Sequence, residues 1–305
     1  MAAPLTRGDA APLRVRCPAK INLGLWILGK RPDGYHEIDT ILQTIALEDD
    51  ITLEPAREGL ALTTRGIPIP GDAPNLVTRA WDLLVERADG RLPRGIRATL
   101  TKRIPVGAGL GGGSSDAAGF LLGANRLLGL GLSMDELHAL AARLGSDVPF
   151  FIRGGTARAT GRGEVVRQLC PMPEPLWMVL VTPPLAISTT WAYRQVSLRL
   201  TRNDDRATFL ESALAGRDLD AAWSEMRNDF EDVVLPRFPV LAALRHALIG
   251  GGAVKALLAG SGSTLFGIQR TREDALRLAN GLVGRGAQVR AVRTLERGAV
   301  VALLA

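Results

Sequence analysis

The residues PVGAGLGGGSSDAAG, at positions 105–119, carry the strongest signal in the sequence. Five glycines fall between positions 107 and 113, after a predicted strand (96–104) and before a predicted helix (114–128). Glycine lets the backbone adopt positive φ and approach a ligand closely. A helix N-terminus offers unpaired N–H groups and the positive end of a dipole, so phosphate binds well there. We therefore expect a phosphate loop; the alternative is a glycine-rich connector without a ligand.

Two better-known glycine-rich motifs match residues 107–114 only in part. GAGLGG at 107–112 matches G-x-G-x-x-G, but the dinucleotide fold places that loop after its first strand, with an acidic residue about 20 residues on at a strand end. Here several predicted strands come first, and Asp135, at that distance, starts a predicted helix. The pattern G-x-x-x-x-G-K-[ST] fails because Gly113 stands where lysine is required. A dinucleotide-dependent oxidoreductase is therefore disfavoured.

Three further segments have ordinary structural interpretations when each is taken alone. In PAKINLGL (18–25), Lys20 can be a lysine whose stem lies along apolar surface. In LGSDVPFF (144–151), Asp147 can be a helix N-cap. AGSGST (259–264) can be a tight turn between two strands.

Together and in this order, the four segments resemble the galactokinase–homoserine kinase–mevalonate kinase–phosphomevalonate kinase superfamily. Within it, the sequence is similar to the 4-diphosphocytidyl-2-C-methyl-D-erythritol kinase family, through RPDGYHEI at 31–38, NLVTRA at 75–80 and RNDFE at 227–231. The resemblance extends from about residue 15 to residue 292. It implies transfer of the ATP γ-phosphoryl group to the 2-hydroxyl of 4-diphosphocytidyl-2-C-methyl-D-erythritol, in the non-mevalonate route to isoprenoid precursors.

The resemblance also implies an α+β fold with two domains and a cleft between them. Residues 1–165 would form a ribosomal-protein-S5-like domain, and residues 166–305 a ferredoxin-like α/β sandwich. The length of 305 residues agrees with two domains of roughly 150 residues each. Outside the glycine loop, the hydrophobic pattern predicts strands at 15–29, 38–47, 50–54, 176–182, 254–258, 264–268 and 288–293. It predicts helices at 75–87, 133–144 (with a Ser133–Glu136 capping box), 206–215, 217–228, 236–249 and 272–283.

Family resemblance assigns the catalytic roles to Lys20 and Asp147. Asp147 would accept the proton of the attacking hydroxyl, and Lys20 would keep Asp147 ionised and favour the developing alkoxide, since a nearby opposite charge lowers a carboxyl pKa. The residues expected at the ATP are Asn75, Pro105, Val106, Gly107, Ala108, Gly109, Leu110, Gly111, Gly112, Gly113, Ser114 and Ser115.

The substrate would contact Asn22, which shares a strand face with Lys20. Tyr35 and His36 resemble the family's cytosine-recognition pair, one stacking and the other reading the base edge, and Tyr193 would stack from the second domain. Mg²⁺ is expected with ATP, bridging β- and γ-oxygens. No residue is assigned as its ligand.

Charge and composition leave other classes of function to weigh. The net charge of +6 suits nucleic acid or an anionic small molecule. The basic residues form no run of five, which disfavours an RNA-binding protein. Two cysteines and three scattered histidines favour neither a disulfide framework nor a metal centre. Another kinase of the superfamily, acting on homoserine or mevalonate, remains an alternative, which DGYH at 33–36 disfavours.

Targeting signals are not evident in the sequence. No apolar run approaches the roughly 18 residues of a membrane span. The N-terminal residues contain no apolar core of a secretory signal. We expect a cytoplasmic protein with small-molecule substrates, no nucleic-acid or membrane partner, and either a monomeric or a homodimeric state.

Overall fold

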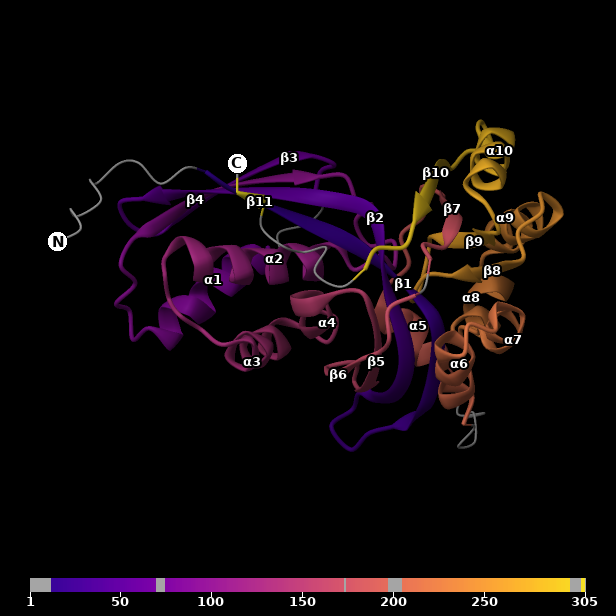
Figure 1. Cartoon of the computed structure of the whole chain (residues 1–305), viewed down its shortest axis with the longest axis horizontal. Coiled ribbons are helices and arrows are strands. Elements are labelled where there is room, and N and C mark those ends of the chain that lie inside the picture. The colour runs from indigo at the N-terminus through magenta and orange to yellow at the C-terminus, as the bar shows by residue number, and fades with distance from the viewer. Residues whose placement is uncertain (1–11, 70–74, 173, 197–204, 297–302, 305) are drawn as a thin grey trace.

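The computed structural model describes residues 12–69, 75–172, 174–196, 205–296 and 303–304. Its framework is a long antiparallel hairpin of β1 (Leu13–Lys30) and β2 (His36–Ala56). Register shifts between Pro18 and Ala19 and between Asn22 and Gly24 bend the hairpin. Figure 1 shows that β1 and β2 run from one half of the molecule into the other. The hairpin therefore carries residues 18–25 to the junction of the two halves.

The large sheet has the strand order β11-β1-β2-β4-β3, with β5 also paired to β2 and β6 to β5. β3 and β4 are parallel, and the other pairings are antiparallel. The bounds of these strands are β3 Leu60–Gly66, β4 Gly95–Lys102, β5 Thr156–Gly161, β6 Val165–Gln168 and β11 Leu303–Leu304.

Four helices cover one face of the large sheet, as Figure 1 shows. They are α1 (Leu76–Arg87), α2 (Gly112–Leu127), α3 (Met134–Leu144) and α4 (Val148–Arg153). Apolar residues at helical spacing, such as Ala117, Phe120 and Leu121 of α2, pack on the sheet in one buried cluster. The predicted Ser133–Glu136 capping box is present at α3.

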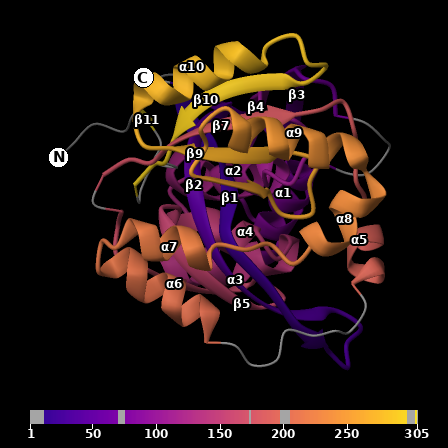
Figure 2. The ribbon, with the colours of Figure 1, turned by 90° about the vertical axis from the view of Figure 1, so that its right-hand side faces the viewer.

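The small sheet is antiparallel, in the order β10-β7-β9-β8. Alternate residues of its strand β7 point to opposite faces, as strand geometry requires. Met178 and Leu180 pack toward the β1–β2 hairpin, whereas Val179 and Val181 pack against the cluster formed with α9 and α10. Figure 2 shows α9 and α10 in front of this sheet. The small sheet is therefore buried on both faces.

The elements of this second half are as follows, with their bounds. The strands are β7 (Trp177–Thr182), β8 (Lys255–Leu258), β9 (Leu265–Gln269) and β10 (Gln288–Arg293). The helices are α5 (Thr189–Gln195), α6 (Arg206–Ala215), α7 (Leu219–Glu225), α8 (Glu231–Arg237), α9 (Pro239–Gly250) and α10 (Arg272–Leu282).

Several predicted elements need correction. The predicted strands 38–47 and 50–54 are one strand, β2. The predicted helix 217–228 is wrong at its end: α7 stops at Glu225, because the next residues pair with Leu25 of β1. The predictions missed β3, β5, β6, α4, α5 and α8. The division after residue 165 stays a prediction.

One finding concerns membranes. Within the described residues, no helix taken singly is long and apolar enough to cross a bilayer. The pair α8 and α9, bent by 109°, passes that test on length and composition only.

Candidate active site

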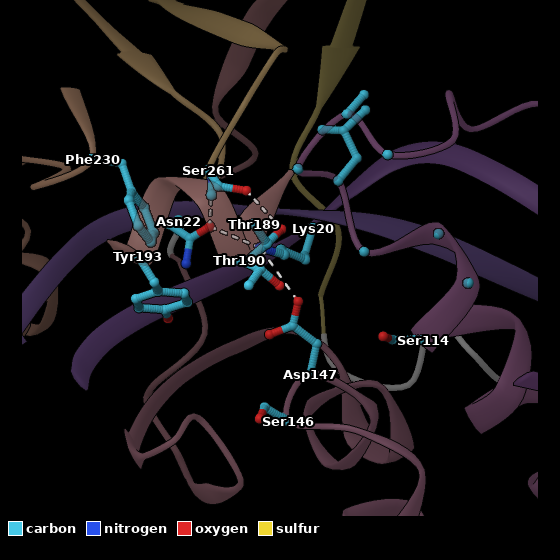
Figure 3. A pocket seen from close by; sticks show the side chains of 18 of the residues that line it. Lys20, Asn22, Ser114, Ser146, Asp147, Thr189, Thr190, Tyr193, Phe230 and Ser261 are labelled. Carbon is cyan, nitrogen blue, oxygen red and sulfur yellow. Dashed lines mark hydrogen bonds and ion pairs between the residues drawn. The ribbon is translucent and has the colours of Figure 1, made fainter. Parts of the chain in front are cut away.

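A cleft of about 1080 Å³ lies where the large-sheet half meets the small-sheet half. It receives residues from β1, the glycine-rich loop, the start of α4, α5 and the loop after β8, parts of which Figure 3 shows. The predicted site residues that line it are Lys20, Asn22, Tyr35, His36, Asn75, Asp147, Tyr193 and the whole run from Pro105 to Ser114. The structure thus gathers residues that are far apart in the sequence.

Ser115 is placed differently from this set. It is fully buried in the first turn of α2, where its backbone N–H donates to the Gly111 carbonyl at 2.9 Å. It does not line the cleft. A direct contact between the Ser115 hydroxyl and ATP therefore finds no support in its position.

The phosphate loop, residues 105–113, lies between β1 and a second glycine loop, residues 259–263. A Cβ atom added at Gly109 would lie 1.9 Å from the Ala259 carbonyl oxygen, so only glycine permits this approach of the two backbones. On the other side, the backbone N–H of Lys20 donates to the Leu110 carbonyl at 2.9 Å. The phosphate loop is therefore fixed at both sides.

Helix α2 begins at Gly112, directly after Gly111 with its left-handed φ of 70°. No side chain caps this helix end. First-turn N–H groups have no partner inside their helix, so this end suits a phosphate group. Gly112 itself has helical φ, and its need for glycine is steric: an added Cβ would lie 2.9 Å from Ile104 Cγ2 and 3.2 Å from Lys102 Nζ.

Lys20 and Asp147 meet at the wall of the cleft. Lys20 Nζ lies 3.5 Å from Asp147 Oδ2 (Figure 3). The lysine side chain is only 5% exposed, whereas the aspartate side chain is 38% exposed. Asp147 does occupy the N-cap position of α4, as the structural alternative predicts, but its side chain makes no capping hydrogen bond. The carboxylate instead combines a nearby cation with access to the cleft.

Asn22 holds the same ammonium group from within the protein. It shares a face of β1 with Lys20, as the strand period predicts, and its Oδ1 accepts from Lys20 Nζ at 2.9 Å. Asn22 Oδ1 also accepts from the Gly260 N–H at 3.0 Å, and its Nδ2 donates to Thr40 Oγ1 at 2.9 Å. The amide is largely engaged by protein groups, and its contact with a substrate stays a prediction.

Aromatic side chains form the opposite end of the cleft. His36 stacks on Tyr193 with ring centroids 4.8 Å apart and planes 18° apart, and Tyr193 meets Phe230 edge to face. Burial, and then the charge of Asp147, raise the pKa of Tyr193 above its usual value. Tyr35 is 54% exposed and carries the guanidinium of Arg162 4.8 Å above its ring. Flat ring faces therefore surround this end.

The surroundings of His36 favour its neutral form. Partial burial, and then the charge of Lys30, lower its pKa below the ordinary value of 6.5. A neutral imidazole has one donor and one acceptor nitrogen. It can therefore exchange hydrogen bonds with the edge of a base.

A second lysine–carboxylate cluster lies behind the phosphate loop. Lys102 Nζ contacts Asp49 and lies 2.6 Å from Asp116 Oδ2, and all three side chains are buried. Burial alone would lower the pKa of Lys102, but the two carboxylates outweigh it and raise the value. Burial, with the nearby charge of Asp49, raises the pKa of Asp116 to about 7.

The Lys102 cluster was missed by sequence reasoning, apart from one signal. Lys102 is one of only four lysines in an arginine-rich chain. Asp116, which follows the phosphate loop, accepts a hydrogen bond from Lys102, and both residues also border the cleft. No role was predicted for Arg162, Thr189 or Phe230, which also line the cleft, although Phe230 lies in the RNDFE segment of the family resemblance.

Metal binding by side chains alone finds no candidate in the part of the chain that the structure describes. No group there brings three or more His, Cys, Asp or Glu side chains together around a possible ion. A divalent cation in this cleft would need ligands from a bound phosphate group, from water or from hydroxyls such as that of Ser114.

The chain resembles known proteins in its sequence and in its fold. Residues 75–155 match the family model of the GHMP kinases N terminal domain. The chain is 41% identical to the 4-diphosphocytidyl-2-C-methyl-D-erythritol kinase of Geobacillus kaustophilus, over 93% of this chain and 97% of that protein. It is 44% identical to the enzyme of the same name from Symbiobacterium thermophilum, over 93% of this chain and all of that one.

Solved structures of related kinases share the fold of this chain. A crystal structure of 4-(cytidine 5′-diphospho)-2C-methyl-D-erythritol kinase matches with a TM-score of 0.79 and 36% identity, over 92% of this chain and 98% of that chain. Homoserine kinase from Cytophaga hutchinsonii, at 18% identity and a TM-score of 0.76, shares the fold. The predicted α+β kinase fold is confirmed. By these likenesses over nearly its whole length, the chain belongs to the GHMP kinases and, among them, to the 4-diphosphocytidyl-2-C-methyl-D-erythritol kinase family.

Proposed function

We propose that this kinase transfers the γ-phosphoryl group of ATP to the 2-hydroxyl of 4-diphosphocytidyl-2-C-methyl-D-erythritol, with Asp147 as the base. The observation that carries the proposal is the 3.5 Å pair of Lys20 and Asp147 in the cleft that the phosphate loop also lines. Phosphoryl transfer needs positioning and charge stabilisation more than covalent chemistry from the protein. One base, one ammonium group and one phosphate loop meet that need.

Asp147 accepts the proton of the attacking hydroxyl. Its partly exposed carboxylate reaches the cleft, whereas the buried Lys20 reaches the same point from behind. The ammonium favours the ionised carboxylate before the reaction and the developing alkoxide during it. Because Asn22 also holds the ammonium, Lys20 keeps a fixed position as charge moves.

The phosphate loop and the start of α2 hold the ATP phosphates. Gly107, Gly109 and Gly111 adopt positive φ, and nothing lies within 4 Å of a Cβ built at Gly107, so a ligand can approach the backbone there. Asn75, whose side chain caps α1 through Val77 N–H at 3.0 Å, lies at the same end of the cleft. Mg²⁺ would enter with ATP and neutralise phosphate charge, and the Ser114 hydroxyl, which borders the cleft, would be available as a ligand.

Cytosine binds at the aromatic end of the cleft. Tyr35 offers an exposed ring, Tyr193 a second ring face, and neutral His36 a donor and an acceptor for the base edge. The contact between His36 and Tyr193 would open or shift when a base inserts. Arg162, held over Tyr35, adds positive charge beside this end, where the substrate carries its diphosphate.

The proposal is tested by ADP release from purified protein with ATP, Mg²⁺ and a panel of alcohols. Turnover should require 4-diphosphocytidyl-2-C-methyl-D-erythritol and a divalent cation. Equal turnover with homoserine or mevalonate would contradict the substrate assignment. No turnover with any alcohol, together with tight RNA binding at physiological salt, would contradict the function as a whole.

Other properties of the protein belong to the same proposal. We expect a cytoplasmic enzyme, either monomeric or homodimeric, with no nucleic-acid or membrane partner. The net charge of +6 then serves two polyanionic substrates, whose encounter rate a positive field raises.

A further inference from the structure

Residues 227–229, which belong to the RNDFE segment of the family resemblance, run beside β1. Leu25 N–H donates to the Arg227 carbonyl at 2.8 Å, and Asp229 N–H donates to the Leu25 carbonyl at 3.0 Å. Asp229 Oδ2 also accepts from Ile27 N–H at 2.9 Å. The small-sheet half thus adds a short strand-like partner to β1, five residues from Lys20. Asn228, in the middle of it, is placed between β1 and the loop after β8.

The side chain of Asn228 is 1% exposed, so it does not reach a substrate. Its Nδ2 donates to the carbonyls of Leu258 and Gly260, at 2.8 and 2.7 Å. Its Oδ1 accepts from Phe230 N–H at 3.0 Å. Two carbonyls require donors and one N–H requires an acceptor, so only an amide in this orientation satisfies all three.

Gly260 connects Asn228 to the catalytic pair. Its carbonyl accepts from Asn228, and its N–H donates to Asn22 Oδ1 at 3.0 Å. The same Asn22 oxygen accepts from Lys20 Nζ at 2.9 Å. A Cβ added at Gly260, where φ is +53°, would lie 3.3 Å from Lys20 Nζ. The second glycine loop therefore lies next to the ammonium group, and hydrogen bonds to the N–H and the carbonyl of Gly260 hold it there.

We infer that Asn228 is a positioning residue of the phosphoryl transfer, acting through Gly260 and Asn22 on the ammonium of Lys20. Without the Asn228 amide, the Gly260 peptide loses one of its two anchors. Asn22 then loses a fixed partner, and the ammonium is free to move relative to Asp147. The inference rests on the proposed function, because it concerns how that site holds its lysine.

The experiment compares kcat and KM of four proteins: wild type, Asn228→Ala, Lys20→Met and the double variant. A misplacement of about 1 Å can cost about 10²-fold in rate. We expect Asn228→Ala to lower kcat roughly 10–100-fold, with both KM values within about threefold. In the Lys20→Met background the same change should lower kcat by less than about threefold, because both substitutions act on one ammonium group.

Glu231→Gln is the matched control. Glu231 Oε1 accepts from Leu258 N–H at 2.7 Å, so it anchors the same residue of β8 through the other peptide group. Its kcat should stay within about threefold of wild type. If Asn228→Ala proves too unstable to assay, Asn228→Ser, which keeps one donor, is measured in the same two backgrounds.

Two results would overturn the inference. One is an unchanged kcat in Asn228→Ala. The other is an equal loss with and without Lys20, which would make Asn228 a purely structural residue. The proposed function is tested separately, by the turnover of the wild type. The effect of Asn228→Ala on kcat, with and without Lys20, can be measured with any acceptor that the wild type phosphorylates.

Discussion

Two lysines of this kinase pair with aspartates near the phosphate loop, and they differ in the number and the burial of their carboxylate partners. Lys20 faces one carboxylate, Asp147, at 3.5 Å, and that carboxylate is open to the cleft. Lys102 contacts two carboxylates, Asp49 and Asp116, both of them buried. The first arrangement leaves a charge that can act on a substrate. The second uses its charge inside the protein.

The number of protein partners around each carboxylate separates the two kinds of ion pair. Asp49 accepts not only from Lys102 but also from the backbone N–H of Ile104, at 2.9 Å, and of Arg103. Together with Asp116 of α2, the Lys102 cluster ties β2, the end of β4 and the start of α2 together. We expect it to hold the phosphate loop in place, whereas Lys20 and Asp147 perform the chemistry.

The largest expected effect follows from replacing Asp147. Asp147→Asn removes the base, and loss of a general base typically costs about 10²–10⁴ in rate. The midpoint of thermal unfolding should change little, since the Asp147 side chain caps no helix. Asp135→Asn, at an exposed position of α3, is the control. A near-wild-type kcat in Asp147→Asn from pH 6 to 9 would refute the base assignment.

The next effect is on stability, at the other lysine. Lys102→Met leaves two buried carboxylates without their cation, and breaking a buried pair in this way costs about 3–5 kcal/mol of unfolding free energy. Urea unfolding measures it. The exposed pair of Arg270 and Asp220 is the control, and Arg270→Met should cost no more than about 1 kcal/mol. If Lys102→Met lowered the unfolding free energy by no more than Arg270→Met does, the structural role of the cluster would be contradicted.

A smaller effect depends on pH. The pKa of Asp116, raised to about 7, means that the folded protein binds a proton that the unfolded chain releases near pH 4. Ionisation of Asp116 therefore lowers stability as pH rises from about 4 to 7. Asp116→Asn lacks this loss, so its stability relative to wild type should improve by about 1–3 kcal/mol between pH 5 and 8. A pH-independent difference in urea unfolding would show that Asp116 has an ordinary pKa.

The smallest effects are expected at the aromatic end of the cleft. Loss of base stacking costs about 1–3 kcal/mol, so Tyr35→Ala should raise KM for the cytidine substrate roughly 5–150-fold. Stacking does not distinguish bases, so Tyr35→Ala should raise KM for a uridine analogue by the same factor. His36→Ala should instead reduce the difference in KM between the cytidine substrate and the uridine analogue. An unchanged KM in Tyr35→Ala would place the base elsewhere.

Local signals account for the part of this structure that could be predicted from the sequence. The Ser133–Glu136 capping box, the Gly145 stop of α3 and the glycine run before α2 depend on neighbours within a few residues. All of the predicted catalytic and phosphate-binding residues except Ser115 line one cleft, and their roles stay predictions.

Contacts between distant segments account for the rest. The Lys102 cluster joins residues 53 and 14 positions apart, and nothing in the local pattern of Asp49 or Asp116 marks a partner. Helical spacing predicts α7 beyond its true end, because it does not show that Asn228 leaves the helix to reach β8 and β1. Such pairings are decided by tertiary packing, which overrides local preference.

The most direct measurement is Lys20→Met, assayed for kcat and for unfolding free energy on the same preparation. Removing an electrostatic donor of a transition state costs about 10²–10³ in rate. The carboxylate left behind, Asp147, is 38% exposed, so water can solvate it once the lysine is gone, and a partly exposed pair of this kind is worth no more than about 1 kcal/mol. We therefore predict a kcat lower by about 10²–10³ with an unfolding free energy within about 1 kcal/mol of that of wild type. An unchanged kcat, or a stability loss as large as that of Lys102→Met, would contradict the division of roles between the two lysines.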